Sequence, residues 1–367
     1  MKKIALVFIC LNPQYWPYLK QVVEDARERF LKGHKLDIFA WSDITEESVN
    51  TYIAANRAPF ENKNGTPEEQ FISMLDPFVW FLRNIGCYDI PYVNEKLKLL
   101  AEEAQITVQP DNGTYVIGTP QEIGELHVQK LLAFVDDILE HNYGSLKKFI
   151  TTINVYETEP VEWPLPTLLR YNLFLQQEET LKQYDYIFYL DADMRVVGDV
   201  GDEILGEGLT MAEHPMYALS RRFTPPYEPN PQSEAYIKRF GVVLQDEYGK
   251  KYFKPLYAAG GFQGGTAKTF IEAMQSMRKA VDKDFVNNYI AIWNDESHWN
   301  KYLSDYEGHL TVLSPSYVYP DSLIEEYYTK IWGRNYTPRI VTLTKPFTTS
   351  KEAGTATSKT LDELKAL

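Results

Sequence analysis

The first forty residues alternate between apolar runs and a helical pattern. Residues 4–10 form a continuous apolar run, as expected for a parallel strand that is buried on both faces. Residues 16–31 place apolar side chains at helical spacing, and Gly33 is a natural stop for that helix. Residues 36–41 form a second strand-like run. The pattern therefore predicts a right-handed β-α-β unit at the start of the chain.

The pattern changes between residues 44 and 146, where helical periodicity dominates. Residues 94–104 and 125–139 carry it most clearly, and turn-forming clusters at 62–67 and 110–113 interrupt it. No motif with an interpretable chemistry occurs in this stretch. We therefore expect residues 44–146 to form a mainly helical insertion.

Strand and helix patterns alternate again after residue 150. The expected elements are a strand at 153–157, a helix at 164–183, a strand at 186–190, a helix at 295–303 and a strand at 311–313. Trp163 and Tyr184, near the ends of the helix, are expected in the core. The fold class is therefore α/β, a single domain with a Rossmann-like nucleotide-binding sheet made from residues 1–43 and 147–346, followed by a polar tail at 347–367.

Composition narrows the classes of partner and compartment. The 367 residues carry a net charge of −14, so the basic surface that nucleic acids or anionic membranes need is not expected. Only two cysteines occur, Cys10 and Cys87, which excludes a disulfide scaffold and favours a reducing compartment. The charged residues 1–3 could open a signal peptide, but the apolar run is short and Pro13 soon follows it. With no apolar stretch of about 18 residues, we expect no membrane span and a cytoplasmic location.

Two acidic residues directly follow the apolar run at 186–190. Asp191 and Asp193 stand one residue apart, just past the carboxyl end of a predicted strand, where open α/β sheets bind ligands. Residues two apart in an extended segment point to the same face, so both carboxylates can converge on one cation. Hard oxygen ligands suit Mg²⁺ or Mn²⁺, especially when diphosphate oxygens complete the shell. A solvated loop or a helix cap is the alternative, and the buried strand before the pair favours the metal.

Acidic residues also open the predicted helix in the segment WNDESHWNKY, residues 293–302. One interpretation is an N-terminal cap, with Asn294 or Asp295 as the cap and Glu296 favouring the helix dipole. The other interpretation places Glu296 at the anomeric carbon of a sugar, where a carboxylate can act as a nucleophile or stabilise an oxocarbenium-like transition state.

A glycine-rich segment, YAAGGFQGG, covers residues 257–265. Its four glycines allow a backbone and a ligand to approach closely, although simple loop flexibility is the alternative. It lacks the pattern and the lysine of a Walker phosphate loop.

Together these motifs resemble the histo-blood-group ABO and α-1,3-galactosyltransferase family of glycosyltransferases. The resemblance is weak over residues 1–41 and good over 155–346, and the run DESHWNKY is its most specific part. The other matching segments, in family order, are WPLPTLLR at 163–170, Asp191-Ala-Asp193, His214-Pro215, Phe223-Thr224, Tyr227-Glu228, PQS at 231–233, AYI at 235–237, Gly264-Gly265 and LSP at 313–315.

The resemblance implies a GT-A fold, a UDP-sugar donor, Mn²⁺ or Mg²⁺, and transfer with retention of anomeric configuration. Glu296 would be the catalytic carboxylate, and Asp191 and Asp193 would hold the metal. The donor-binding residues would be Phe8 and Tyr15 near uracil, Arg170, Asp191, Ala192, Asp193, Ala259, Gly260, Gly261, Asp295, and Lys345 at the diphosphate. The acceptor-binding residues would be His214 and Thr224.

Several positions depart from the family pattern. Asn294 replaces a histidine, Gln263 replaces an aromatic residue before the Gly-Gly pair, and Tyr319-Pro-Asp321 replaces a Trp-Asp pair. Family members with glycine at the position of Gly261 tend to use GalNAc, so UDP-GalNAc is the expected donor, with some use of UDP-Gal. Two rival functions stay open: a sugar nucleotidyltransferase, and a non-catalytic carbohydrate-binding descendant of such an enzyme.

Overall fold

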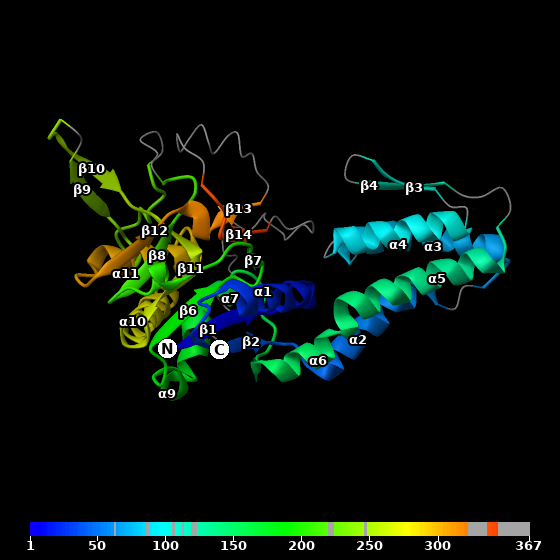
Figure 1. The fold of residues 1–367 in the computed structure, drawn as a ribbon, viewed down its shortest axis with the longest axis horizontal. Helices are drawn as coiled ribbons and strands as arrows, with labels where there is room; N and C mark the ends of the chain where they lie inside the picture. Colours follow the sequence, from blue (N-terminus) through cyan, green and yellow to red (C-terminus); the bar gives the residue numbers. More distant parts are fainter. Residues whose placement is uncertain are drawn as a thin grey trace.

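A seven-stranded mixed sheet forms the centre of the molecule (Figure 1). The computed structural model describes residues 1–61, 64–85, 89–104, 107–111, 114–118, 123–218, 224–245, 248–321 and 336–343. Across the sheet the strands are β12 (Leu310–Leu313), β8 (Leu209–Glu213), β11 (Ala258–Thr266), β6 (Tyr186–Leu190), β1 (Lys3–Cys10), β2 (Lys35–Ser42) and β5 (Asn154–Glu157). Strand β11 runs antiparallel to both of its neighbours, and the other pairs are parallel. The predicted β-α-β unit is confirmed, with α1 (Trp16–Arg29) between β1 and β2.

Both faces of the sheet are covered, which explains the continuous apolar runs of its central strands. Along β1, Ile4 and Leu6 pack on the same side as the apolar residues of α1. Ala5 and Val7 pack on the other side, against α8 (Arg170–Leu175), α10 (Ala267–Val286) and α11 (Asn294–Asp305). Because successive side chains of a strand point to opposite faces, this one apolar strand contributes to two separate cores.

A group of helices projects from one end of the sheet, as Figure 1 shows. It contains α2 (Glu46–Arg57), α3 (Pro67–Asn84), α4 (Ile90–Ala104), α5 (Glu125–Leu139) and α6 (Leu146–Phe149), with a hairpin of β3 (Thr107–Asp111) and β4 (Thr114–Gly118). Capping boxes start two of these helices, Thr45 with Ser48 in α2 and Thr66 with Glu69 in α3. Their buried residues continue the core that lies on the α1 side of the sheet. No helix within the described residues is long and apolar enough to cross a bilayer.

The prediction of a single helix at 164–183 is wrong. The chain instead forms three short helices, α7 (Leu165–Leu168), α8 and α9 (Glu178–Leu181). Gln177 leaves the helical region, with φ −113° and ψ 26°, and so separates α8 from α9. Arg170 opens α8 and is buried, because it faces the edge of the sheet and not solvent.

Two small sheets flank the central one. Strands β9 (Gly241–Gln245) and β10 (Lys251–Pro255) form a hairpin that leads into β11. Strand β14 (Ile340–Thr342) lies between β13 (Tyr319–Pro320) and β7 (Met194–Val196), and so brings the C-terminal part of the described chain beside β7. The short helical turns are η1 (Pro13–Tyr15), η2 (Ala58–Phe60), η3 (Glu140–Gly144), η4 (Ile150–Thr152), η5 (Asp202–Ile204) and η6 (Pro315–Tyr317).

Candidate functional site

The candidate site lies where β6 ends and β11 begins. Because the two strands are antiparallel, the last residue of β6, Leu190, pairs with Phe262 in the middle of β11, and the first half of β11 extends past the end of β6. The backbone N–H of Asp191 donates to the carbonyl of Gly261 at 3.1 Å. The acidic pair and the glycine-rich segment, which are far apart in the sequence, therefore meet at one edge of the sheet.

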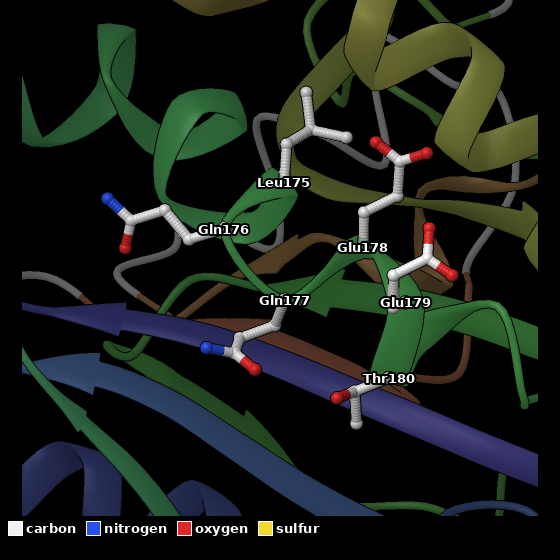
Figure 2. Close-up of a pocket in the computed structure, with 6 residues that line it drawn as sticks. All are labelled: Leu175, Gln176, Gln177, Glu178, Glu179 and Thr180. Carbon is white, nitrogen blue, oxygen red and sulfur yellow. The ribbon is translucent and has the colours of Figure 1, made fainter.

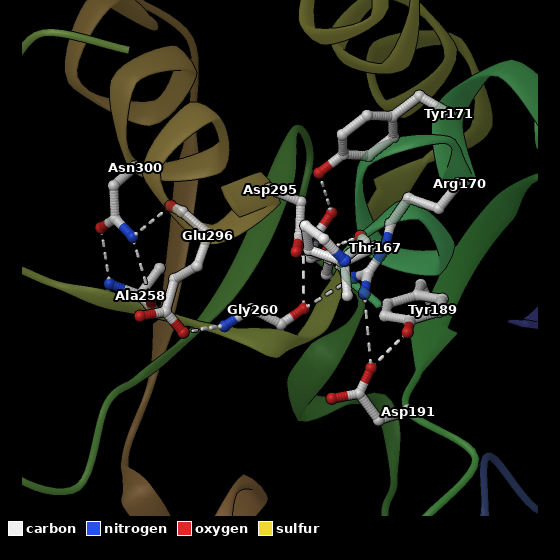
Figure 3. Close-up of polar contacts among 12 residues, drawn as sticks. Thr167, Arg170, Tyr171, Tyr189, Asp191, Ala258, Gly260, Asp295, Glu296 and Asn300 are labelled. Atoms are coloured by element: carbon white, nitrogen blue, oxygen red, sulfur yellow. Dashed lines mark hydrogen bonds and ion pairs between the residues drawn. The ribbon is translucent and has the colours of Figure 1, made fainter. Parts of the chain in front are cut away.

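Arg170 connects three parts of this edge, as Figure 3 shows. Its Nη1 lies 3.0 Å from Oδ2 of Asp295 and donates to the Gly260 carbonyl at 3.2 Å. Its Nη2 lies 3.6 Å from Oδ1 of Asp191, and the guanidinium is 4.1 Å from the ring centroid of Tyr189. A buried arginine needs such partners, so its position in the site explains a charge on an otherwise apolar helix.

Burial and the opposite charge of the partner have opposing effects on the pKa values of Arg170 and Asp295. Burial alone would lower the pKa of Arg170, but Asp295, Tyr189 and Asp191 outweigh it, and the pKa is raised. Burial raises the pKa of Asp295 to about 6, against the opposing effect of Arg170. The guanidinium therefore stays charged, while Asp295 titrates close to neutral pH.

Helix α11 begins without a side-chain cap. Its N-cap residue is Trp293, whose side chain makes no capping hydrogen bond and whose backbone N–H donates to the Ser297 hydroxyl at 3.1 Å, and Asn294 has a φ of 48°. Asp295 instead contacts Arg170, and Oε2 of Glu296 accepts a hydrogen bond from the N–H of Gly260 at 2.7 Å. The capping interpretation of Asn294 and Asp295 is therefore wrong, because the first-turn carboxylates face the sheet edge.

Glu296 has an electrostatic setting suited to a reacting carboxylate. Burial raises its pKa to about 7, the Tyr257 hydroxyl and the Gly260 N–H lower the pKa, and Asp295 and Asp191 raise it. A group that titrates near neutral pH, beside other acidic groups, is typical of a functional site.

The buried carboxylate of Glu228 binds the segment that precedes α11. Glu228 is completely buried and accepts from the Ile292 N–H at 2.7 Å and from the Tyr289 hydroxyl at 2.7 Å. These bonds fix the backbone just before Trp293. The position of Asp295 and Glu296 therefore depends on a residue outside the site.

Two of the four glycines of β11, Gly260 and Gly261, pack closely against the acidic residues. A Cβ on Gly260 would lie 3.1 Å from Cβ of Glu296. A Cβ on Gly261 would lie 2.6 Å from Oδ2 of Asp191 and 2.5 Å from Cε of Met194, closer than such atoms can pack. Gly261 therefore allows Asp191 to lie against the strand, a constraint in addition to any room that the glycine gives a donor sugar.

The oxygen donors of the acidic pair fit a hard divalent cation. Asp191 is half-buried and accepts from the Tyr189 hydroxyl, and Asp193 is buried. In the part of the chain that the structure describes, no three acidic, histidine or cysteine side chains are grouped so as to hold a metal. Asp191 and Asp193 would supply two carboxylates, and a diphosphate or water would supply further oxygen ligands.

A group of aromatic rings, His214, Tyr217 and Tyr257, lies near Glu296. His214 donates its backbone N–H to the carbonyl of Tyr257 at 2.8 Å, and its ring centroid lies 5.1 Å from that of Tyr217. Burial lowers the pKa of His214 to about 4, so its imidazole is neutral at pH 7. The charge of Glu296 contributes to the raised pKa of Tyr217, which places this tyrosine in its vicinity. His214 is thus joined to the site, whereas Thr224 is exposed and its acceptor role stays a prediction.

The remaining expected donor residues have different outcomes. Phe8 is fully buried in the core on the α1 side, so its expected contact with uracil is corrected: the ring packs inside the protein. Tyr15 is half-buried and ends η1, beyond the carboxyl end of β1. Ala192 and Ala259 are buried beside the site residues that they adjoin. Lys345 lies outside the described residues, although the N–H of Leu343 donates to the Asp193 carbonyl at 3.0 Å.

Sequence reasoning marked Gln263 only as a departure from the family pattern and gave Asn300 no separate role, but the structure places both in the site. Gln263 is completely buried in β11 and bonds to Tyr171 of α8. Asn300 of α11 exchanges two hydrogen bonds with the backbone of Ala258, at 2.8 and 2.9 Å, and so fastens the helix to the start of the strand. A polar residue within the strand segment AAGGFQGG was the available signal for Gln263.

A surface pocket elsewhere is separate from this constellation. It has a volume of about 320 Å³ and is lined by residues 175–180, which join α8 to α9 (Figure 2). None of the expected site residues lines it.

Comparisons with known proteins agree with the motifs. The model of glycosyltransferase family 6 matches residues 171–331. The chain is 31% identical over 267 residues to rat histo-blood group ABO system transferase 1, covering 69% of this chain and 70% of that protein. It is 31% identical over 140 residues to human globoside α-1,3-N-acetylgalactosaminyltransferase 1, covering 38% of this chain and 36% of that protein. It is 28% identical over 184 residues to the O-antigen biosynthesis glycosyltransferase WbnI of Escherichia coli, covering 50% of this chain and 73% of that protein. The chain therefore belongs to glycosyltransferase family 6, the histo-blood-group ABO and α-1,3-galactosyltransferase family, and is a glycosyltransferase.

Proposed function

We propose that this glycosyltransferase transfers GalNAc or Gal from a UDP-sugar to a sugar acceptor, in α linkage and with retention of configuration, on a GT-A-type sheet. One observation carries the proposal. At the edge of the sheet where parallel strands end, Gly260 and Gly261 lie against four charged side chains: Arg170, Asp191, Asp295 and Glu296.

Glu296 is the proposed catalytic carboxylate. Its ionised form would stabilise positive charge at the anomeric carbon or attack it directly, as carboxylates do in retaining glycosidases. With a pKa of about 7, the carboxylate is about half ionised at neutral pH before substrate binds. A bound cation or a charged donor sugar carbon would favour the ionised form further.

Asp191 and Asp193 are the proposed protein ligands of Mn²⁺ or Mg²⁺. Their carboxylate oxygens are the donors that these ions prefer, and diphosphate oxygens would complete the coordination shell. The ion, when bound, offsets the negative charge that develops on departing UDP. The guanidinium of Arg170 contacts both Asp191 and Asp295, so this one side chain orients the proposed metal ligand and the first turn of α11.

Transfer requires an acceptor beside Glu296, and the aromatic residues there support an acceptor site. The neutral imidazole of His214 can hydrogen-bond a sugar hydroxyl without a charge to desolvate. Tyr217 is half-buried and offers an apolar ring of the kind that packs against sugars, and the buried ring of Tyr257 supports it at 5.1 Å between centroids. Thr224 is proposed as a further acceptor contact and Lys345 as a diphosphate contact, on the family resemblance alone.

The donor sugar is proposed as GalNAc in preference to Gal. One relative is named for N-acetylgalactosamine transfer, and this chain has glycine at position 261. The test is a screen of UDP-Gal, UDP-GalNAc, UDP-Glc and UDP-GlcNAc for UDP release with Mn²⁺, with and without simple sugar acceptors. UDP-GalNAc should give the highest kcat/KM, and a tenfold preference for UDP-Gal would contradict this choice of donor. Fractionation of cells would test the expected cytoplasmic location.

A further inference from the structure

Gln263 is a fully buried amide in a strand of small and apolar residues. Burying an amide without hydrogen bonds is costly, so a polar side chain at such a position needs partners. The resembled family carries an aromatic residue here, which would need none. The partners of Gln263 therefore indicate what this chain gains from the exchange.

Each end of the amide has a partner from a different element. Oε1 accepts from the Tyr171 hydroxyl of α8 at 3.0 Å. Nε2 donates to the Gly260 carbonyl at 3.0 Å and, more weakly, to Oδ2 of Asp295 at 3.4 Å. Carbonyl and carboxylate oxygens only accept, so the NH₂ end must face Gly260 and Asp295, and the oxygen end must face the hydroxyl of Tyr171. The chemistry of the three partners thus fixes the orientation of the amide.

The Gly260 carbonyl is held from two sides. Gln263 and Arg170 both donate to it, at 3.0 and 3.2 Å. Gly260 has no side chain to restrict its backbone, so these two bonds limit the rotation of its peptide groups. The N–H of the same residue donates to Glu296 at 2.7 Å. Holding the carbonyl therefore restricts the backbone at Gly260, next to the N–H that orients the proposed catalytic carboxylate.

We propose that Gln263 is a positioning residue that sets the geometry of Glu296 and Asp295, and that Tyr171 acts through it. Gln263 acts through Gly260 and Asp295. The inference rests on the proposed function of this site. It assigns to this chain a polar brace, Tyr171 to Gln263 to Gly260 and Asp295, in place of an aromatic side chain.

The test compares Gln263→Met, Tyr171→Phe and the double variant. Methionine keeps the length of the side chain but removes every hydrogen bond, and phenylalanine removes only the hydroxyl. Misplaced catalytic groups cost on the order of 10- to 100-fold, so kcat of Gln263→Met should fall by that amount while its KM for the UDP-sugar changes by less than about threefold. Tyr171→Phe should lower kcat by about 3- to 10-fold, and should lower it no further in the Gln263→Met background.

A matched control separates positioning from stability. Thr210 is also completely buried in the sheet, and its hydroxyl donates to the carbonyl of Ile204, which is not a site residue, at 2.9 Å. Thr210→Val should lower Tm and leave kcat unchanged. If Gln263→Met does not fold, Tyr171→Phe decides alone, because it keeps the ring in place.

The outcomes distinguish this inference from the function it rests on. If the wild type is active and kcat of Gln263→Met is unchanged, the positioning role alone is overturned. If Gln263→Met does not fold, an unchanged kcat in Tyr171→Phe has the same meaning. Equal losses from Tyr171→Phe in the wild-type and Gln263→Met backgrounds would overturn the claim that Tyr171 acts through Gln263. A wild type that transfers no sugar from any UDP donor would overturn the proposed function, and the positioning role with it.

Discussion

Replacement of Arg170 by methionine should destabilise the protein in a pH-dependent way. The side chains of Arg170 and Asp295 are 4% and 7% exposed, so the substitution leaves Asp295 as a buried acid without its cation. Removing one partner of a buried pair costs about 3–5 kcal/mol. Asp191 is 35% exposed and should add little. At about 2 °C per kcal/mol for a chain of this size, the expected loss in Tm is roughly 6–10 °C at pH 8.

The sign of the pH dependence follows from Asp295. Its pKa is raised to about 6 while Arg170 is present, and without that cation the pKa rises further. A raised carboxyl pKa costs stability above the unfolded-state pKa, and the cost grows until the pH reaches the folded-state pKa. At pH 5 the variant can keep Asp295 protonated, so its loss in Tm should be clearly smaller than at pH 8.

Thermal melts of wild type and variant at both pH values measure this difference. Arg195→Met is the matched control outside the site, because Arg195 is 32% exposed and its partner Asp25 keeps two other contacts. These are Arg29 at 4.0 Å and the Val196 N–H at 3.2 Å. The control should lose less Tm, with less dependence on pH. Equal losses at pH 5 and pH 8 for Arg170→Met would refute the assignment of Asp295 as the uncompensated acid.

Three further predictions concern the metal, the glycine strand and the support of α11. EDTA should abolish transfer and Mn²⁺ should restore it, and full activity in EDTA would refute the metal proposal. Changing both Asp191 and Asp193 to asparagine should remove activity without unfolding the protein. Gly261→Ala should lower kcat with UDP-Gal and UDP-GalNAc alike, because its Cβ would press on Asp191; a change in donor preference at full kcat would show that Asp191 adapts. Glu228→Gln should cost about 1–3 kcal/mol of stability, since the amide NH₂ must face one of two donors, the Ile292 N–H or the Tyr289 hydroxyl. An unchanged denaturation midpoint would contradict the supporting role.

The central strands could be predicted because burial on both faces leaves an unambiguous apolar run. The strands at 4–10 and 186–190 appear as Lys3–Cys10 and Tyr186–Leu190. The helix at 164–183 could not be predicted as three pieces, because apolar spacing continues across the turn that Gln177 makes. Trp163 was expected in the core, but its side chain is 55% exposed, because residue type does not say which side of a turn faces solvent.

The site was predictable as far as its motifs extend. Asp191, Asp295 and Glu296 each lie at the end of a recognisable element, and the structure brings them together around Arg170. The bond between Tyr171 and Gln263 was not predictable, because it depends on how α8 packs over β11 and not on local spacing. The failure at Phe8 has a similar cause: the resemblance placed the residue, but the alternation of β1 turns its ring into the core.

The central claim is that Glu296 carries sugar transfer from a UDP donor. The most direct measurement is steady-state UDP release and sugar transfer by wild type and Glu296→Gln, with Mn²⁺, UDP-GalNAc or UDP-Gal, and a panel of sugar acceptors. The wild type should transfer sugar, and Glu296→Gln should bind UDP as tightly while its kcat falls by about 100-fold or more. A Glu296→Gln variant that binds UDP and turns over like the wild type would contradict the account.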